Sequence, residues 1–278
     1  MSHREDSLFL CLRIPKSGSS SLSRALGQAL AGATIFYLPN TLELDGRLSR
    51  FQHLRFRRAQ ICNLVANYGT PSLEQAFTRI ACEAAPGDLL SGGHIDFPTV
   101  RRRLGTRVKI ITILRDPFAR CRSEYHYARQ NQLKKPTLSR FDSNVVPQIA
   151  ARYDFEGYLD FLLDHRDVYG DIACAYLGIS AHDDIASFFA QNVFHAGVLE
   201  HSRQFAQGLS EKLDRPIAFP HLNKSGGEQH VALSARVRRK IQNLCARDIL
   251  VYEWQLAGTK SASRGGRARE QFCVNYAH

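Results

Sequence analysis

The sequence predicts a three-layer α/β protein in which a central parallel sheet is flanked by helices. Two apolar runs, at residues 8–14 and 108–114, have the length and composition of buried strands. Each run is followed by a short polar segment and then by a stretch that predicts a helix. This alternation of strand and helix in the first half of the chain is typical of strands that lie parallel in one sheet.

A small polar loop follows the first predicted strand. Residues 15–21 are Pro-Lys-Ser-Gly-Ser-Ser-Ser, and apolar residues then resume at helical spacing from Leu22. A strand, a polar loop and a helix in this order can cradle a phosphate, because the first N–H groups of the helix and its dipole favour an anion. The residues that this pattern offers to a phosphate are Lys16, Ser17, Gly18, Ser19, Ser20 and Ser21.

The order of residues in this loop excludes two common nucleotide-binding motifs. A Walker A loop needs Gly-Lys followed by Ser or Thr, whereas here Lys16 precedes Gly18. The loop also lacks the Gly-x-Gly-x-x-Gly spacing of dinucleotide sites. Taken alone, the loop has an alternative interpretation as a serine-rich helix cap that binds nothing.

A second corner follows the predicted strand at 108–114. Arg115 comes directly after the strand, Asp116 is a candidate helix cap, and Pro117 suits a first helical turn. Ser123 lies about two helical turns further on. Because ligands of open α/β sheets bind outside the carboxyl ends of the strands, the two corners together predict a ligand with two phosphate-like groups.

These corners resemble the PAPS-dependent sulfotransferases, which use 3′-phosphoadenosine-5′-phosphosulfate (PAPS) as sulfuryl donor. Residues 14–22 resemble the 5′-phosphosulfate loop of that family, and residues 114–117 with Ser123 resemble its 3′-phosphate motif. The resemblance is closest to the branch of glycan 2-O- and 6-O-sulfotransferases and their bacterial relatives, and a bacterial tyrosylprotein sulfotransferase is the kind of enzyme that it implies. Weaker likeness continues at 93–94, 198–202, 222–225 and 248–253.

The resemblance implies a P-loop-like fold, PAPS as the donor and no metal. It assigns Lys16 to the bridging oxygen of the leaving phosphate, the loop 17–21 to the 5′-phosphosulfate, and Arg115 with Ser123 to the 3′-phosphate. A bidentate arginine suits a phosphate better than a lysine does. A further loop is expected to close over the donor phosphates, with a solvated turn as the alternative; its residues are Asn223, Lys224 and Ser225.

A base must accept the proton of the acceptor hydroxyl, and His94 is the first candidate. It follows a short predicted strand and two glycines, and the ordinary pKa of histidine, about 6.5, is close to working pH. Glycan 2-O-sulfotransferases use a histidine in a similar Gly-His context, whereas animal tyrosylprotein sulfotransferases use a glutamate, from which this chain departs. Asp96 is the second candidate, and a histidine that only packs at a strand end is the alternative interpretation.

The acceptor is predicted to be tyrosine in an acidic peptide, with a hydroxyl of an anionic glycan as the alternative. The net charge of +11 fits both acceptors, since each is anionic. Nucleic acid is disfavoured as a partner, because no recognition motif accompanies the basic charge. The oligomeric state is left open.

Cysteine usage and hydropathy exclude several other classes of protein. The seven cysteines are scattered and form no Cys-x-x-Cys pair, which predicts neither a zinc site nor a disulfide framework. No apolar run is long enough to span a membrane, and the apolar stretch near the amino terminus is too short for a signal peptide. We therefore expect a cytoplasmic, bacterial enzyme.

The remaining pattern predicts one sulfotransferase domain at 1–257 and a basic, flexible tail at 258–278. Residues 131–148 predict a long loop, which is a candidate lid facing the acceptor. A short strand is expected at 88–91, followed by a short helix with Arg101, Arg102 and Arg103. Other helices are expected at 47–67, 72–83, 154–165, 182–190, 201–213 and 234–254.

Overall fold

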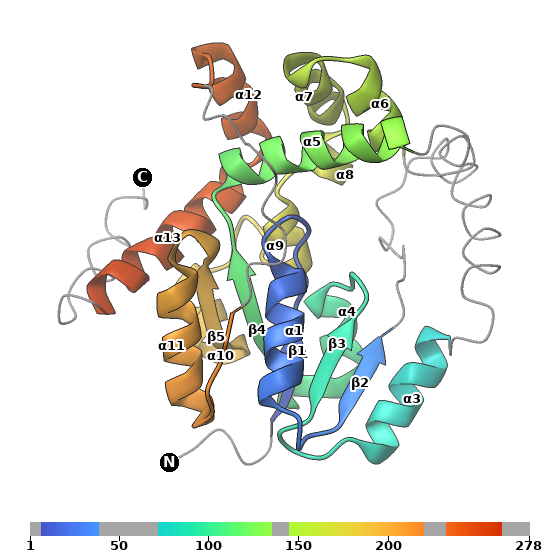
Figure 1. The fold of residues 1–278 in the computed structure, drawn as a ribbon, viewed down its shortest axis with the longest axis vertical. Coiled ribbons are helices and arrows are strands. Elements are labelled where there is room, and N and C mark those ends of the chain that lie inside the picture. The colour runs from blue at the N-terminus through green and yellow to red at the C-terminus, as the bar shows by residue number, and fades with distance from the viewer. Residues whose placement is uncertain (1–6, 39–71, 135–144, 220–231, 263–278) are drawn as a thin grey trace.

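A five-stranded, wholly parallel sheet forms the centre of the computed structural model (Figure 1). The structure describes residues 7–38, 72–134, 145–219 and 232–262. The strand order is β2-β3-β1-β4-β5, so the first strand lies in the middle and its neighbours come from later in the chain. The strands are β1 (Leu8–Cys11), β2 (Ile35–Leu38), β3 (Leu89–Gly92), β4 (Val108–Leu114) and β5 (Val193–Val198).

Helices cover both faces of the sheet, which confirms the predicted three-layer α/β fold. Alternate residues of β1 point to opposite faces, so Leu8 and Leu10 join one apolar cluster and Phe9 and Cys11 join the other. The first cluster packs under α3 (Leu73–Glu83), α4 (Phe97–Leu104), α9 (Ile172–Leu177), α10 (Ile185–Asn192) and α13 (Ala246–Ala262). The second packs under α1 (Ser19–Ala29) and α11 (Ser202–Leu213).

A third apolar cluster belongs to helices beyond the carboxyl ends of the strands. In Figure 1 helix α5 (Pro117–Lys134) crosses above the arrowhead of β4, from which it continues directly. Its buried residues Cys121, Tyr125 and Ala128 pack against α6 (Val146–Arg152), α7 (Phe155–Asp164) and α12 (Ala235–Leu244). The short α8 (Arg166–Tyr169) connects α7 to the sheet layers. This helical cap stands over the edge of the sheet where the two predicted corners meet.

Capping side chains explain why several helices begin where the sequence predicts. Ser72 accepts from the backbone N–H of Gln75 while the Gln75 side chain accepts from that of Ser72, which forms a capping box at α3. Asp154 caps α7 through the N–H of Gly157. The strand predicted at 108–114 is confirmed with the same bounds, and the one predicted at 88–91 lies within a residue of β3.

Four local predictions differ from the structure. Strands β2 and β5 were not expected, since short strands depend on their neighbours for pairing. Helix α5 reaches Lys134 and α6 begins at Val146, so residues 131–134 and 146–148 of the predicted loop are helical instead. The helix expected at 234–254 breaks at Cys245 into α12 and α13.

Helix α13 also continues to Ala262, where the sequence predicted a tail from 258 onward. Its buried residues Val251 and Trp254 pack on the sheet, and the Gln255 amide donates to the carbonyl of Ala196 over 2.8 Å. These contacts stabilise α13 beyond residue 258, where the predicted tail begins. The rest of the tail, 263–278, and the helix predicted at 47–67 lie outside the described residues.

Candidate active site

The loop after β1 has an unusual backbone conformation. Lys16 has a φ of 63° and Gly18 a φ of 78°, both in the left-handed region, and α1 begins at Ser19. A left-handed non-glycine residue costs free energy, on the order of 1–3 kcal/mol, and such strain clusters at functional sites. The loop is thus held in a shape that places Lys16 at the start of the helix.

Gly18 is required by a close contact as well as by its backbone conformation. A Cβ atom at this position would lie 2.7 Å from Cδ1 of Leu199, which follows β5. Such a separation is much shorter than a normal contact between carbon atoms. The contact therefore brings the segment 198–202 against the polar loop.

The polar groups around the start of α1 are mostly buried. Ser17, Ser19 and Ser21 are almost inaccessible to solvent, whereas Ser20 is exposed. The first turn of a helix presents backbone N–H groups, and the helix dipole places partial positive charge there. Together with the Lys16 ammonium, this end of α1 suits an anion.

Arg115 connects the second corner directly to this loop. Its Nη1 donates a hydrogen bond of 3.1 Å to the carbonyl of Lys16. Asp116 caps α5 by accepting from the N–H of Phe118 over 2.7 Å, as the sequence predicts. Ser123 lies buried on α5, two turns beyond the corner. The hydrogen bond therefore brings the two predicted corners into contact at the carboxyl ends of β1 and β4.

Tyr127 lies one helical turn after Ser123 and contacts the loop lysine. The Lys16 Nζ atom lies 3.7 Å from the centroid of the Tyr127 ring, a cation–π distance. The ring is 54% exposed, in contrast to its neighbour Tyr125, which packs inside the helical cap. The ring therefore gives the Lys16 ammonium a defined position beside α5.

His94 follows β3 and is joined to the same region through Arg13. Its Nδ1 lies 2.9 Å from the carbonyl of Arg13. A carbonyl can only accept, so Nδ1 carries the proton and Nε2 of the neutral ring has the lone pair. Burial, aided by the charge of Arg13, lowers the pKa of His94 below its usual 6.5, against the effect of the hydrogen bond to the Arg13 carbonyl. The lowered pKa favours the neutral imidazole, in which Nε2 is the ring atom that can accept a proton.

Asp96 has a different environment, at the start of α4. One carboxylate oxygen accepts from the backbone N–H of Thr99 over 2.7 Å, and the other accepts from the Thr99 hydroxyl over 3.2 Å. Both oxygens of Asp96 thus serve a helix cap.

A comparison with protein-family models assigns the part of the chain that contains this loop, arginine and serine to one family. The model of the sulfotransferase domain matches residues 6–189, about two thirds of the chain. The chain belongs to the sulfotransferase family. A search of curated proteins finds no match. The matched span includes both corners and His94, so transfer of a sulfo group is the activity class of this protein.

Residues beyond the matched span 6–189 form hydrogen bonds with the elements that carry the site. Glu200 accepts from the backbone N–H of Asp116 over 3.1 Å, which holds the corner after β4. Burial and the charges of Glu200 and Asp116 raise the pKa of Tyr252, which lies beside them. Asp248 accepts from the N–H groups of Ala173 and Cys174 at the start of α9. Residues of the weaker motifs at 198–202 and 248–253 therefore stabilise the fold through these hydrogen bonds.

Arg13, whose carbonyl accepts from His94, was not predicted from the sequence as part of the site. It interrupts the apolar run 8–14 with a charge, and that interruption was a usable signal. Tyr127 was expected to pack or to line the adenosine side of the site, and its contact with Lys16 forms only when α5 packs over the loop. The predicted residues Asn223, Lys224 and Ser225 lie outside the described residues.

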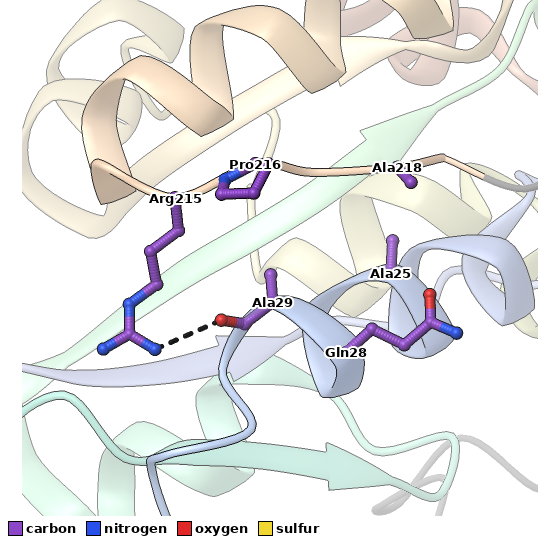
Figure 2. Close-up of a pocket in the computed structure, with 6 residues that line it drawn as sticks. All are labelled: Ala25, Gln28, Ala29, Arg215, Pro216 and Ala218. Carbon is purple, nitrogen blue, oxygen red and sulfur yellow. Dashed lines mark hydrogen bonds between the residues drawn. The ribbon is translucent and has the colours of Figure 1, made fainter.

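A cavity of about 390 Å³ lies on the α11 side of α1, away from the predicted site residues (Figure 2). Ala25 and Ala29 on α1 face Pro216 and Ala218, and Arg215 donates to the Ala29 carbonyl over 3.3 Å. In the described part of the chain, no group of three or more potential metal ligands is found. No helix among the described residues is both long and apolar enough to cross a bilayer.

Proposed function

We propose that this sulfotransferase moves the sulfuryl group of PAPS to the phenolic hydroxyl of tyrosine in an acidic peptide. The observation that carries the proposal is the hydrogen bond from Arg115 to the carbonyl of Lys16. It joins two anion-binding corners into one surface, which suits a nucleotide with phosphates at both its 3′ and 5′ positions. PAPS has that pattern and supplies the sulfuryl group when bound.

The residues present fit such a donor. Lys16 and the loop of Ser17, Gly18, Ser19, Ser20 and Ser21 would hold the 5′-phosphosulfate, and Arg115 with Ser123 would hold the 3′-phosphate. The N–H and hydroxyl donors of the loop would meet the phosphate oxygens, and the loop 223–225 is proposed to complete this side. We call these residues, at the ends of β1 and β4, the donor side.

Lys16 and His94 are proposed to carry the chemistry between them. As the bond from sulfur to the bridging oxygen breaks, negative charge develops on the leaving phosphate, and the Lys16 ammonium neutralises it. The Nε2 lone pair of His94 takes the proton of the attacking hydroxyl. His94 is hydrogen-bonded to the carbonyl of Arg13, and Arg13 precedes Lys16 by three residues in the chain. Both groups therefore belong to one corner of the sheet.

The weak basicity of His94 favours a phenol over an alcohol as acceptor. Its pKa is lowered by burial, so it removes a proton most readily from an acceptor that is itself acidic. A phenol, with a pKa of about 10, is far more acidic than a sugar hydroxyl. Transfer to a carbohydrate hydroxyl is the second candidate, which the resemblance of Gly93-His94 to glycan 2-O-sulfotransferases supports.

The test is a transfer assay with PAPS labelled in its sulfuryl group. The acceptors are an acidic peptide with one tyrosine, the same peptide with phenylalanine in its place, and an acidic oligosaccharide. We expect label in the tyrosine peptide alone. Label only in the oligosaccharide would replace the first candidate with the second. No transfer to either acceptor, despite tight binding of 3′,5′-diphosphoadenosine, would contradict the catalytic proposal.

A further inference from the structure

A second cavity, of about 400 Å³, lies on the opposite flank of α1 from the one in Figure 2, between that helix and the edge strand β2. Its polar side chains come from Arg13, Ser20, Ser23, Arg24, Gln28 and Tyr37, of which Ser20 also belongs to the donor side. None of the roles proposed above uses Arg24 or Tyr37. The cavity therefore requires an explanation of its own.

The cavity shares Arg13 with His94 and lies across β1 from the predicted 3′-phosphate site. Strands β3 and β2 lie on one side of β1, and β4, with Arg115 at its end, lies on the other. Arg13 connects the cavity to His94, because its carbonyl accepts from His94 Nδ1 and its Nη1 donates to the carbonyl of Gly92. We call His94 and this cavity the acceptor side.

The charge of the cavity is entirely positive. Arg13 and Arg24 are the two charged residues that line it, and within the described residues neither forms an ion pair. Nε of Arg13 is buried and has no hydrogen-bond partner in that part of the chain. Because Nε itself is inaccessible, a ligand would meet Arg13 at the atoms that line the cavity, where the guanidinium charge would stabilise an anionic oxygen.

Strand β3, which precedes His94, contacts both sides of the cavity: helix α1 through a hydrogen bond and strand β2 through strand pairing. The Ser23 hydroxyl lies 2.8 Å from that of Ser91, and Ser91 pairs with Tyr37 in the register of β2 and β3. Tyr37 is 70% exposed, although large aromatic side chains usually find a covering surface. An aromatic face next to two guanidinium groups suits a short acidic side chain and its neighbouring backbone.

We propose that this cavity binds a glutamate or aspartate side chain that lies close to the acceptor tyrosine, with Arg24 and Arg13 as its cationic partners. This inference rests on the proposed function and names the feature that selects the peptide. Arg24 is exposed, so it contributes selectivity through charge and is screened by salt.

The test compares three peptides that differ only in the residues flanking one tyrosine: glutamate, glutamine or lysine. Wild-type kcat/KM is expected to be highest for the glutamate peptide, through KM, and to lose that advantage at high salt. Arg24→Glu should lower kcat/KM for the glutamate peptide by roughly ten-fold and raise it for the lysine peptide. Arg107→Glu is the matched control, because Arg107 directly precedes β4 at the amino ends of the strands, and it should change none of these values.

A binding measurement that requires no sulfuryl transfer tests this inference independently of the proposed function. Versions of the peptides with phenylalanine in place of tyrosine are titrated into enzyme loaded with 3′,5′-diphosphoadenosine, so that no transfer is needed. Tighter binding of the glutamate version, abolished by Arg24→Glu, supports the cavity assignment even if the transfer assay fails. Equal binding of all three versions, or an equal effect of Arg24→Glu on all three, would overturn it. Binding of the acidic oligosaccharide instead of any peptide would also overturn it.

Discussion

The donor side and the acceptor side of the site differ in how deeply their side chains are buried and in how they are hydrogen-bonded. On the donor side, Ser17, Ser19 and Ser123 are buried, and Arg115 is bonded to the Lys16 carbonyl. On the acceptor side, Arg24 and Tyr37 face solvent, and His94 and Arg13 are only partly buried. A site that positions reacting atoms needs fixed groups, whereas an exposed charge can select among ligands without fixing them. The difference indicates that the donor side sets the geometry of transfer and the acceptor side sets the choice of acceptor.

The largest effect is expected where the two sides meet, at His94. His94→Asn retains a side-chain N–H for the Arg13 carbonyl but removes the proton acceptor, so kcat should fall by about 10²- to 10⁴-fold. The wild-type pH profile of kcat/KM should have an acidic limb below pH 6.5, because burial lowers the pKa of His94 and the neutral form is the active one.

The acidic limb should disappear in His94→Asn, while binding of 3′,5′-diphosphoadenosine and the thermal melt stay as in the wild type. Activity near the wild-type level in the variant would exclude His94 as the base. It would also remove the link between the acceptor side and the chemistry.

On the donor side, Lys16→Ala should lower kcat by about 10²- to 10³-fold, because it removes the charge that stabilises the leaving phosphate. KM for the peptide should change little, since the acceptor side is intact. Lys109→Ala is the control, because Lys109 lies at the start of β4 and bonds the carbonyl of Gln191. If lost turnover followed lost structure in a circular dichroism melt, the catalytic role of Lys16 would be wrong.

A smaller effect tests whether the donor side is as rigid as its contacts indicate. Gly18→Ala places a Cβ 2.7 Å from Leu199 and strains the backbone at a φ of 78°. The free energy of unfolding should fall by roughly 1–3 kcal/mol, and donor affinity should fall with it. Gly87→Ala isolates the backbone strain, because its φ is 88° and a Cβ there would meet nothing within 4 Å. Equal losses in the two variants, measured by chemical denaturation, would mean that the Leu199 contact adds nothing.

The strands and helices that carry the proposed donor side were largely predictable from sequence, and His94 was a sequence-based candidate, whereas the cavity of the acceptor side was not predicted. Lys16, Arg115 and Ser123 lie within short local patterns of strand, loop and helix, which a single sequence displays. Their contacts, such as Arg115 on the Lys16 carbonyl, depend on two strands becoming neighbours in the sheet. The capped helices at 72–83 and 154–165 were likewise predictable, because their signals are local.

The acceptor-side cavity depends on β2, which the sequence did not predict. Ile35–Leu38 is short, and it becomes a strand by pairing with β3, whose sequence lies some fifty residues away. Arg24 resembles any exposed arginine on an amphipathic helix until that strand packs beside it. Residues whose role arises from tertiary neighbours are the ones that sequence patterns miss.

The most direct test of the account is a calorimetric comparison of 3′,5′-diphosphoadenosine with adenosine 5′-monophosphate. If the corners after β1 and β4 form one site, the wild-type enzyme should bind the diphosphate more tightly, and Arg115→Ala should remove about ten- to one-hundred-fold of that preference. Affinity for the monophosphate should be nearly unchanged in the variant. Equal affinity of the wild-type enzyme for the two nucleotides would contradict the central claim that Lys16 and Arg115 bind the two phosphates of one donor.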